Sequence, residues 1–219
     1  MARIGIIGAG FGGLAMAIRG LDAGHDVTVF ERSDDVGGTW SANTYPGAEC
    51  DIPSALYSYS FAPYAEWPNK WSHQPVILDY LRDCADRYDV TPRIRFETAV
   101  TAIHWDGTVW HVTSDHAGTE ASDEFDVVVS ATGQLSRPRI PDIAGLDTFA
   151  GPAFHSARWD HDVDLAGRRI AVIGNAASAT QFVPEIAPDA ARVTVFQRSA
   201  NWMIAKNDKD YSERWKSAL

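Results

Sequence analysis

The chain has 219 residues, of which 45% are hydrophobic, and this composition excludes a disordered or fibrous protein and supports one or two globular domains. Its 19 basic and 29 acidic residues give a net charge of −10, which excludes the clustered positive field that a nucleic-acid partner requires. Only two cysteines occur, Cys50 and Cys84, and their wide spacing excludes a redox or metal-binding pair, so we expect no metal.

The chain begins with an apolar strand, a glycine-rich turn, a helix and a second strand. Ile4–Ile7 forms the first strand, and Gly8, Gly10 and Gly13 form the pattern GxGxxG before a helix over residues 14–21. Backbone N–H groups at such a helix N-terminus, around Phe11, can bind a pyrophosphate. The strand over residues 27–30 ends at Glu31, whose carboxylate can accept hydrogen bonds from ribose hydroxyls but repels a 2′-phosphate. The turn therefore favours FAD or NAD over NADP.

The middle of the chain predicts a helix, a hairpin and a third buried strand. Apolar residues over 75–88 follow helical spacing, and residues 100–113 alternate around the turn dipeptide Asp106-Gly107. The strand over residues 126–130 leads into Ala131-Thr132-Gly133. Residues 134–148 contain two prolines and several small residues, and are typical of a connector. We expect a first domain over residues 1–145 and a second over residues 146–219.

The second domain repeats the first unit at an offset of 166 residues. Residues 170–173 form a strand, Gly174 begins the turn, residues 180–187 form a helix and residues 193–196 a strand. The spacing from Gly8 to Glu31 is 23, and the spacing from Gly174 to Gln197 is also 23. The sequence therefore predicts an α/β fold with two dinucleotide-binding, Rossmann-like units and a β-meander in the first.

The second turn differs from the first in its chemistry. Ala176 and Ala179 stand where glycines are expected, so the backbone is held further from a pyrophosphate. The strand ends in Gln197-Arg198-Ser199, and an arginine there can bind a 2′-phosphate through charge-assisted hydrogen bonds. These residues favour NADPH over NADH. A plain packing turn followed by a surface arginine is the alternative.

One twelve-residue stretch resembles a family fingerprint. Residues 149–160 carry Phe149, Gly151, His155, Trp159 and Asp160, and fill every fixed position of the FxGxxxHxxxW pattern, followed by proline or aspartate, of type I Baeyer-Villiger monooxygenases. The related flavin-containing and N-hydroxylating monooxygenases usually have another aromatic residue at position 159. Disulfide reductases share the order of the two nucleotide units, but they need a cysteine pair that this chain lacks.

Further stretches resemble the same family: residues 37–40, 45–51, 53–61 and 131–133. The resemblance implies that Asp51 and Tyr57 lie beside the flavin and that His155 acts on domain linkage and cofactor handling. Glu49 departs from the family, which often has arginine there. The catalytic candidates are Asp51, Tyr57 and His155. The expected cofactor-binding residues are Gly8, Gly10, Phe11, Gly13, Glu31, Arg32, Gly38, Thr39, Trp40, Asp51, Tyr57, Val100, Ala131, Thr132, Gly133, Gly174, Asn175, Ala176, Ser178, Ala179, Arg198 and Ser199.

Each of the singled-out side chains also has a structural interpretation. His155 can be a hydrogen-bonded structural histidine, and Trp159, like Trp40, can be a core aromatic. Asp51 can be a turn or capping residue. Tyr57 alternates with Tyr59 as residues of a strand do. The sequence leaves these alternatives open.

The resemblance implies an enzyme that uses FAD, NADPH and O₂ to insert one oxygen atom beside a ketone carbonyl, giving an ester or lactone. The alternatives are a monooxygenase acting on nitrogen or sulfur, an NADH-linked flavin reductase, and a non-catalytic fragment or one partner of a split enzyme. The resemblance runs from residue 4 to about residue 202, yet the family's proteins are longer. We therefore expect the 219 residues alone to be inactive, and a second chain is one possible source of the remaining part of the enzyme.

The sequence also bears on location. No run reaches the ~20 apolar residues of a membrane span and no signal peptide is evident, so a cytoplasmic location without membrane contact is expected.

Overall fold

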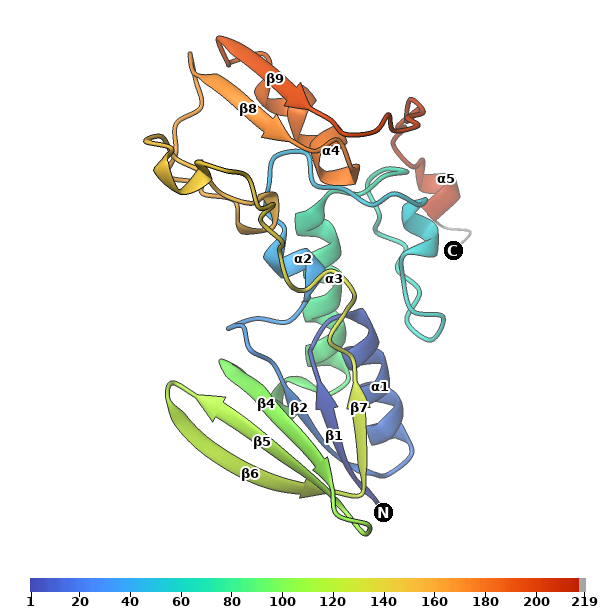
Figure 1. The fold of residues 1–219 in the computed structure, drawn as a ribbon. Helices are drawn as coiled ribbons and strands as arrows, with labels where there is room; N and C mark the ends of the chain where they lie inside the picture. Colours follow the sequence, from blue (N-terminus) through green and yellow to red (C-terminus); the bar gives the residue numbers. More distant parts are fainter. Residues whose placement is uncertain (217–219) are drawn as a thin grey trace. The chain divides into compact units, whose positions relative to one another are not determined.

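The computed structural model describes residues 1–216 as a mixed α/β protein that divides into two compact units (Figure 1). The first unit consists of residues 1–41 and 77–136, and the second of residues 42–76 together with residues from 137 onward. The predicted α/β class with parallel strands is confirmed. The predicted domain boundary at residue 145 stays a prediction, and residues 42–76 cluster with the later part of the chain.

A four-stranded parallel sheet forms the centre of the first unit, with the strand order β3-β2-β1-β7. Its two central strands are apolar runs, as expected for parallel strands covered on both faces, and Ile6 and Val29 are fully buried. Ile7 at the end of β1 lies opposite Phe30 at the end of β2. The strands are β1 (Arg3–Ile7), β2 (Asp26–Phe30), β3 (Ile94–Arg95) and β7 (Val127–Ser130).

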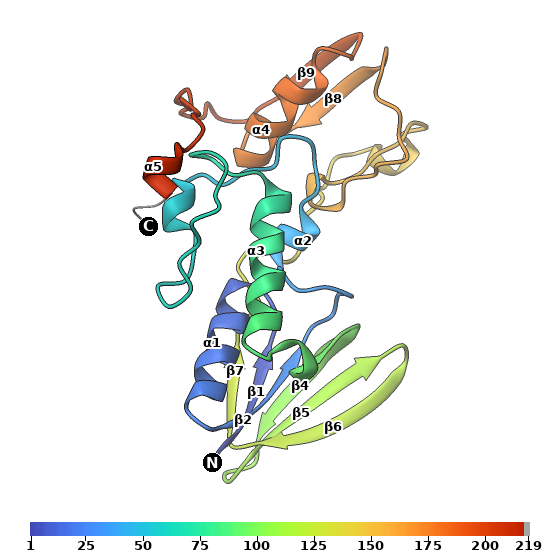
Figure 2. The same ribbon diagram turned by 180° about the vertical axis from the view of Figure 1, so that it is seen from behind.

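Two helices cover one face of this sheet, α1 (Phe11–Asp22) and α3 (Gln74–Arg87), and they lie side by side in Figures 1 and 2. Helix α1 buries Leu14, Ala17 and Ile18, which follow the three-and-four spacing of a single helical face. The rings of Phe11 in α1 and Tyr80 in α3 have centroids 6.2 Å apart. The predicted helix over residues 75–88 is confirmed with a shift of one residue. A short helix, α2 (Thr39–Ala42), follows the first strand pair in the sequence.

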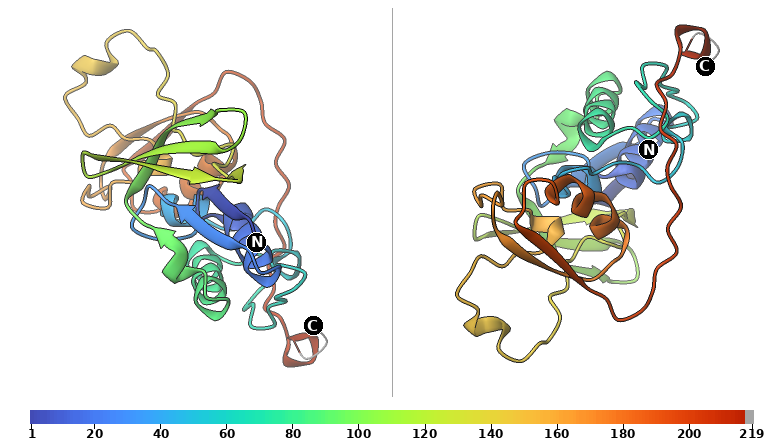
Figure 3. Two further views of the ribbon diagram at one scale, coloured as in Figure 1. Left: turned by 90° about the horizontal axis from the view of Figure 1, so that it is seen from below. Right: turned by 90° about the horizontal axis from the view of Figure 1, so that it is seen from above.

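An antiparallel meander covers the other face, and Figure 3 shows it on the side of the parallel sheet opposite α3. Phe125 at the end of the meander packs on Phe30, and a methyl group at Gly5 of β1 would lie 2.8 Å from the Phe125 ring. The predicted hairpin is confirmed: Gly107 has a φ of 104°, and Asp106 accepts hydrogen bonds from two backbone N–H groups beyond it. The strands are β4 (Thr98–Trp105), β5 (Trp110–His116) and β6 (Thr119–Phe125).

The second unit repeats the first strand–helix–strand arrangement at the predicted offset of 166 residues. Ile173 at the end of β8 lies opposite Phe196 at the end of β9, just as Ile7 lies opposite Phe30. Val172, Phe182 and Ile186 form a small core with Trp159 packed against it. The elements are β8 (Arg169–Ile173), α4 (Ala177–Ile186), β9 (Arg192–Phe196) and the terminal helix α5 (Glu213–Lys216).

Residues 42–76 contribute mostly irregular backbone to the second unit, held by buried hydroxyl groups. Ser54 and Ser72 are fully buried, and Ser54 Oγ lies 2.8 Å from Ser72 Oγ and 3.0 Å from the carbonyl oxygen of Lys70. The Ser72 N–H also donates to Ser54 Oγ at 2.8 Å. These hydrogen bonds pair buried polar atoms, which would otherwise destabilise the fold. Across residues 1–216, no helix combines the length and apolar character needed to cross a membrane.

Candidate functional site

The first glycine turn joins β1 to α1 and leaves the start of the helix open. Gly8 has a φ of +102°, a conformation that side chains rarely adopt, and its N–H donates to the carbonyl oxygen of Phe30 at 2.8 Å. Gly10 is the N-cap residue of α1; it makes no side-chain capping bond, and the first helical turn contains no acidic residue. Uncapped N–H groups and the positive end of the helix dipole make this turn a site for an anion such as a pyrophosphate.

Packing explains why the first turn consists of glycines. A Cβ at Gly13 would lie 1.8 Å from the carbonyl oxygen of Gly8, and a Cβ at Gly8 would lie 2.7 Å from the carbonyl oxygen of Ala131. At Gly10 the nearest atom is the Cα of Gly38, at 3.7 Å, so a methyl there would fit in ordinary van der Waals contact beside the helix start. The residues therefore form a cradle that fits a pyrophosphate. The structure brings Gly38, Ala131 and Thr132, which belong to the predicted segments 37–40 and 131–133, to this turn.

Glu31 closes the same turn from the end of β2. Its side chain is buried, its Oε2 accepts the N–H of Ala9 at 2.7 Å, and its Oε1 accepts the N–H of Ser33 at 2.9 Å. A carboxylate has about four lone-pair positions, so two remain for the hydroxyl groups of a ribose. The position and chemistry of Glu31 fit the predicted role, and the two backbone bonds add a structural one.

Glu31→Gln is expected to lower the free energy of unfolding by about 1–3 kcal/mol, because the amide NH₂ must face one of two backbone N–H donors and leaves it unpaired. The same change should weaken FAD binding. Thermal unfolding followed by circular dichroism checks the first effect, and flavin titration the second. Glu120→Gln is the matched control because Glu120 is exposed on β6. Equal melting temperatures for the two variants would contradict the structural role.

The second glycine turn has the same backbone conformation as the first, but fewer atoms lie close to its first glycine. Gly174 has a φ of +106°, and its N–H donates to the carbonyl oxygen of Phe196 at 2.9 Å. Ala176 is the N-cap of α4, again without a side-chain cap or an acidic first turn. A Cβ at Gly174 would meet no atom within 4 Å, and the Ala179 methyl packs against the core of the unit. Nothing equivalent to Ala131 closes this turn within the described part of the chain.

Asn175 forms hydrogen bonds that link this turn to the residues directly after β9. Its Nδ2 donates to Gln197 Oε1 at 2.8 Å and to the carbonyl oxygen of Ser199 at 3.0 Å. Asn201 Nδ2 donates to the carbonyl oxygen of Asn175 at 2.9 Å. Arg198 lies between these bonded residues with an exposed side chain. An exposed guanidinium beside an uncapped helix start is suited to bind a 2′-phosphate.

A pocket of about 550 Å³ lies in the second unit, beside α4. Three segments line it: residues 47–51 with His73, residues of α4 beginning at Ala177, and residues 201–206. Its polar groups include the carboxylates of Glu49 and Asp51 and the ammonium of Lys206. The predicted residue Asp51 thus shares a pocket with the start of the helix that follows the second glycine turn. We call it the Asp51 pocket.

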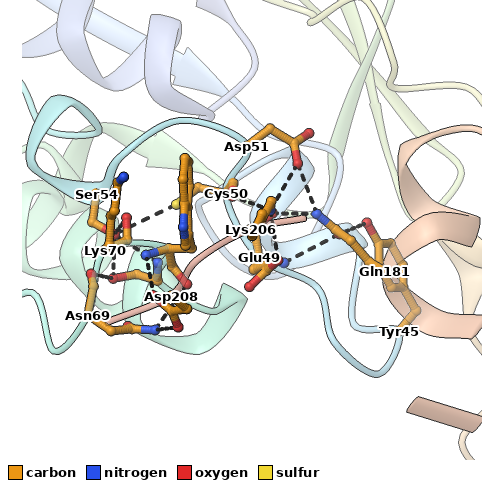
Figure 4. A network of polar contacts seen from close by, with 12 residues as sticks. Tyr45, Glu49, Cys50, Asp51, Ser54, Asn69, Lys70, Gln181, Lys206 and Asp208 are labelled. Carbon is orange, nitrogen blue, oxygen red and sulfur yellow. Dashed lines mark hydrogen bonds and ion pairs between the residues drawn. The ribbon is translucent and has the colours of Figure 1, made fainter. Parts of the chain in front are cut away.

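Gln181 and Lys206 organise the polar side of the Asp51 pocket (Figure 4). Gln181 Nε2 donates to Asp51 Oδ1 at 3.1 Å, and Lys206 Nζ donates to the same oxygen at 3.3 Å. Burial alone would lower the pKa of Lys206, but its hydrogen bonds and charge interactions with Glu49 and Asp51 raise it above the usual lysine value. Lysine in this pocket is therefore a fixed positive charge.

Tyr45 extends the network on the side of α4. Its hydroxyl donates to Gln181 Oε1 at 2.8 Å, and burial raises its pKa despite a hydrogen bond with Ser178. Tyr45 therefore stays a neutral donor at neutral pH. Ser178, a predicted cofactor residue, is half-buried in the first turn of α4.

The fingerprint residues of the second unit mainly support its packing. His155 is the N-cap of a short 3₁₀ helix, Ser156–Arg158, and its Nδ1 accepts the N–H of Ala157 at 3.0 Å. Trp159 packs on Phe154 and Phe182, with ring centroids 5.2 Å apart in both pairs. Phe149 is 61% exposed. The interpretations of His155 as a hydrogen-bonded structural histidine and of Trp159 as a core aromatic thus agree with their contacts.

The other predicted residues occupy several places. Arg32 donates to the carbonyl oxygen of Ser136 at 2.7 Å, and Val100 packs beside the Phe30 cluster. Trp40 is buried within α2, which begins at Thr39. Tyr57 directly follows the 3₁₀ helix Ser54–Leu56, in a bend and not in a strand, and it is half-buried.

Two residues at the site were missed by the sequence reasoning, Gln181 and Lys206. Gln181 lies in the helix after the second turn, where helical spacing predicts only which residues face the core. Lys206 lies in irregular backbone after β9, and its partners are more than 150 positions away. The one sequence signal for Lys206 is Glu49, an acidic residue where the family often has arginine, because a partly buried carboxylate requires a positive charge nearby.

Comparisons with known proteins agree with this geometry. Residues 1–214 match the model of the family described as flavin-binding monooxygenase-like. A Baeyer-Villiger monooxygenase of Streptomyces coelicolor is 50% identical over 213 residues, which cover 96% of this chain and 40% of the relative. The chain thus spans about two fifths of the length of this relative.

Two solved structures are similar over nearly the whole chain. A steroid monooxygenase bound to NADP gives a TM-score of 0.89 with 41% identity, and covers 99% of this chain with 42% of its own. OTEMO in complex with FAD and NADP gives 0.92 with 36% identity and the same coverage. Because the family model matches almost every residue, the chain belongs to the flavin-binding monooxygenase-like family.

Proposed function

We propose that the chain is the cofactor-binding portion of a Baeyer-Villiger monooxygenase that binds FAD at the first glycine turn and NADPH at the second. The observation that carries the proposal is the repeated turn. Gly8 and Gly174 share a φ within 4°, both donate to the last residue of the next strand, and both precede an uncapped helix. Two such sites in one chain fit two nucleotides.

The residues of the first turn would hold FAD. The backbone around Gly10 and Phe11 offers N–H groups to the pyrophosphate, and Glu31 offers its remaining lone pairs to the ribose. In the second unit, Arg198 supplies the positive charge for the 2′-phosphate of NADPH. Bound together, FAD and NADPH supply the redox chemistry with which O₂ is activated. A solved relative is described in complex with both nucleotides.

The Asp51 pocket supplies the oriented charges that this reaction needs. Asp51 accepts two hydrogen bonds that fix one of its carboxylate oxygens, while its side chain stays 64% exposed and available to further groups. Gln181 and Lys206 hold this carboxylate without transferring a proton. We propose a ketone and O₂ as the small-molecule substrates. The cytoplasmic location stays part of this proposal.

The reported relative carries the matching region and its other three fifths in a single chain, so a second polypeptide is not supported as a partner. Names among the relatives give further support to the reaction class. One relative from Pseudomonas putida, 40% identical, is named 2-oxo-Delta(3)-4,5,5-trimethylcyclopentenylacetyl-CoA monooxygenase. This name supports an oxo compound as the substrate class.

Cofactor binding is tested on the purified chain. We expect the visible spectrum of bound oxidised flavin at one FAD per chain, and tighter binding of NADPH than of NADH. A chain that binds no flavin even at excess FAD would contradict the proposal.

The reaction class is tested in a chimera in which this chain replaces the matching 40% of the Streptomyces coelicolor relative. With NADPH and ¹⁸O₂, a panel of ketones should give esters carrying one labelled oxygen. Thioethers and amines serve as the competing substrates. A chimera that forms only sulfoxides or N-oxides would favour the nitrogen- or sulfur-oxygenating class instead.

A further inference from the structure

Lys206 binds three consecutive residues through a single ammonium group. Its Nζ donates to Glu49 Oε1 at 2.7 Å, to the carbonyl oxygen of Cys50 at 2.9 Å and to Asp51 Oδ1 at 3.3 Å. An ammonium has three N–H donors, so all three are used. The side chains of Lys206 and Glu49 are only 28% and 19% exposed, which strengthens the ion pair relative to one in water.

Gln181 holds the same segment from α4 (Figure 4). Its Nε2 donates to the carbonyl oxygen of Glu49 at 3.0 Å and to Asp51 Oδ1 at 3.1 Å. Its Oε1 accepts the Tyr45 hydroxyl at 2.8 Å and the N–H of Glu49 at 3.4 Å. Asp51 Oδ1 is therefore held by two donors from two different segments, and the backbone on its N-terminal side is fixed as well.

The charge balance of the pocket depends on Lys206. Glu49 and Asp51 place two carboxylates within reach of one ammonium, so the three groups carry a net charge of −1, which becomes −2 if the ammonium is removed. Glu185 adds a third carboxylate to the lining, and Lys206 is the one lysine or arginine among the described residues that line the pocket. Without Lys206 the carboxylates repel each other, and the segment around them loses its anchor.

We propose that Lys206 is a positioning residue that fixes the orientation of Asp51 by neutralising Glu49 and binding residues 49–51. The proposal rests on the proposed function, in which Asp51 belongs to the active site. It also accounts for the acidic residue Glu49. The family that this chain resembles often has arginine at this position, whereas in this chain Lys206 supplies the positive charge. The backbone that carries Lys206 follows Ser199 and Asn201, which are both hydrogen-bonded to Asn175 in the second glycine turn. NADPH binding at that turn should therefore also restrict the movement of Lys206.

Hydrogen exchange of the 219-residue chain tests this proposal without any cofactor. In Lys206→Met, the backbone amides of residues 48–50 should exchange about tenfold faster or more, because charge-assisted bonds to the segment are lost. Lys206→Arg should restore most of the protection. Lys209→Met is the matched control, three positions away on an exposed side chain, and should exchange like the wild type. Equal exchange in Lys206→Met and Lys209→Met would overturn the proposal.

The spectrum of bound flavin gives a second readout. In the FAD-loaded chain, Lys206→Met should change the shape of the flavin absorption bands, and Lys206→Arg should return it to that of the wild type. An unchanged spectrum together with faster exchange would overturn the link to Asp51 in the active site. A wild-type chain that binds no FAD would contradict the proposed function instead, and the exchange result would still decide whether Lys206 holds the segment.

Discussion

Gly13→Ala is expected to abolish FAD binding and to lower the free energy of unfolding by about 3 kcal/mol or more, the upper range for overpacking. The added methyl would lie 1.8 Å from the carbonyl oxygen of Gly8, and no side-chain rotation can relieve this distance, because the backbone fixes the position of a Cβ. Helix α1 must move away from β1, and this movement opens the cradle for the pyrophosphate. Chemical denaturation and flavin titration measure the two effects.

Two neighbouring glycines supply the controls for this prediction. A Cβ at Gly12 would lie 4.0 Å from the Ala131 Cβ, so Gly12→Ala should fold normally and gain a few tenths of a kcal/mol of helix stability. Gly10→Ala should also fold, because its methyl has room, but should weaken FAD binding by blocking close approach. A Gly13→Ala chain as stable as Gly12→Ala would show that packing does not require the third glycine.

Arg198→Ala is expected to remove most of the preference for NADPH over NADH. Hydrogen bonds to charged groups contribute about 1.5–3 kcal/mol each, so NADPH affinity should fall by roughly 10- to 150-fold while NADH affinity changes little. The Arg198 side chain is exposed, and the structure therefore predicts little change in stability. Fluorescence titration with the two dinucleotides gives both dissociation constants.

Arg192→Ala is the control for Arg198→Ala. Arg192 is an exposed arginine on the same strand, at the end away from the glycine turn. Its removal changes the net charge equally but should leave both affinities unaltered. If the two variants lose NADPH affinity to the same extent, the effect is one of general charge, and the assignment of Arg198 to the 2′-phosphate fails.

Local signals made the two strand–helix–strand units predictable. The spacing from Gly8 to Glu31 and the offset to Gly174 depend on short-range geometry, because a strand, a tight turn and a helix must each have a given length to fit together. The structure shows the same pairing register in both units. The helices begin earlier than expected, at Phe11 and Ala177, because the last residues of each predicted turn form the first turn of the helix.

The polar network around Asp51 could not be predicted, because its partners come from distant parts of the sequence. Gln181 and Lys206 lie 130 and 155 positions from Asp51. No periodicity or spacing rule links such residues, and only the folded second unit brings them together. Trp159 shows the reverse case: the fingerprint singled it out, but its packing on Phe182 became visible only with the core of the unit.

The difference between the two glycine turns has a kinetic consequence. The first turn is closed by backbone atoms of Ala131 and Gly38 and is already in its binding shape, whereas the second has open space around Gly174. A preformed cradle loses little entropy on binding and slows dissociation, so under the proposed function we expect FAD to leave the first turn more slowly than NADPH leaves the second. Dilution of the loaded chain would measure both residence times.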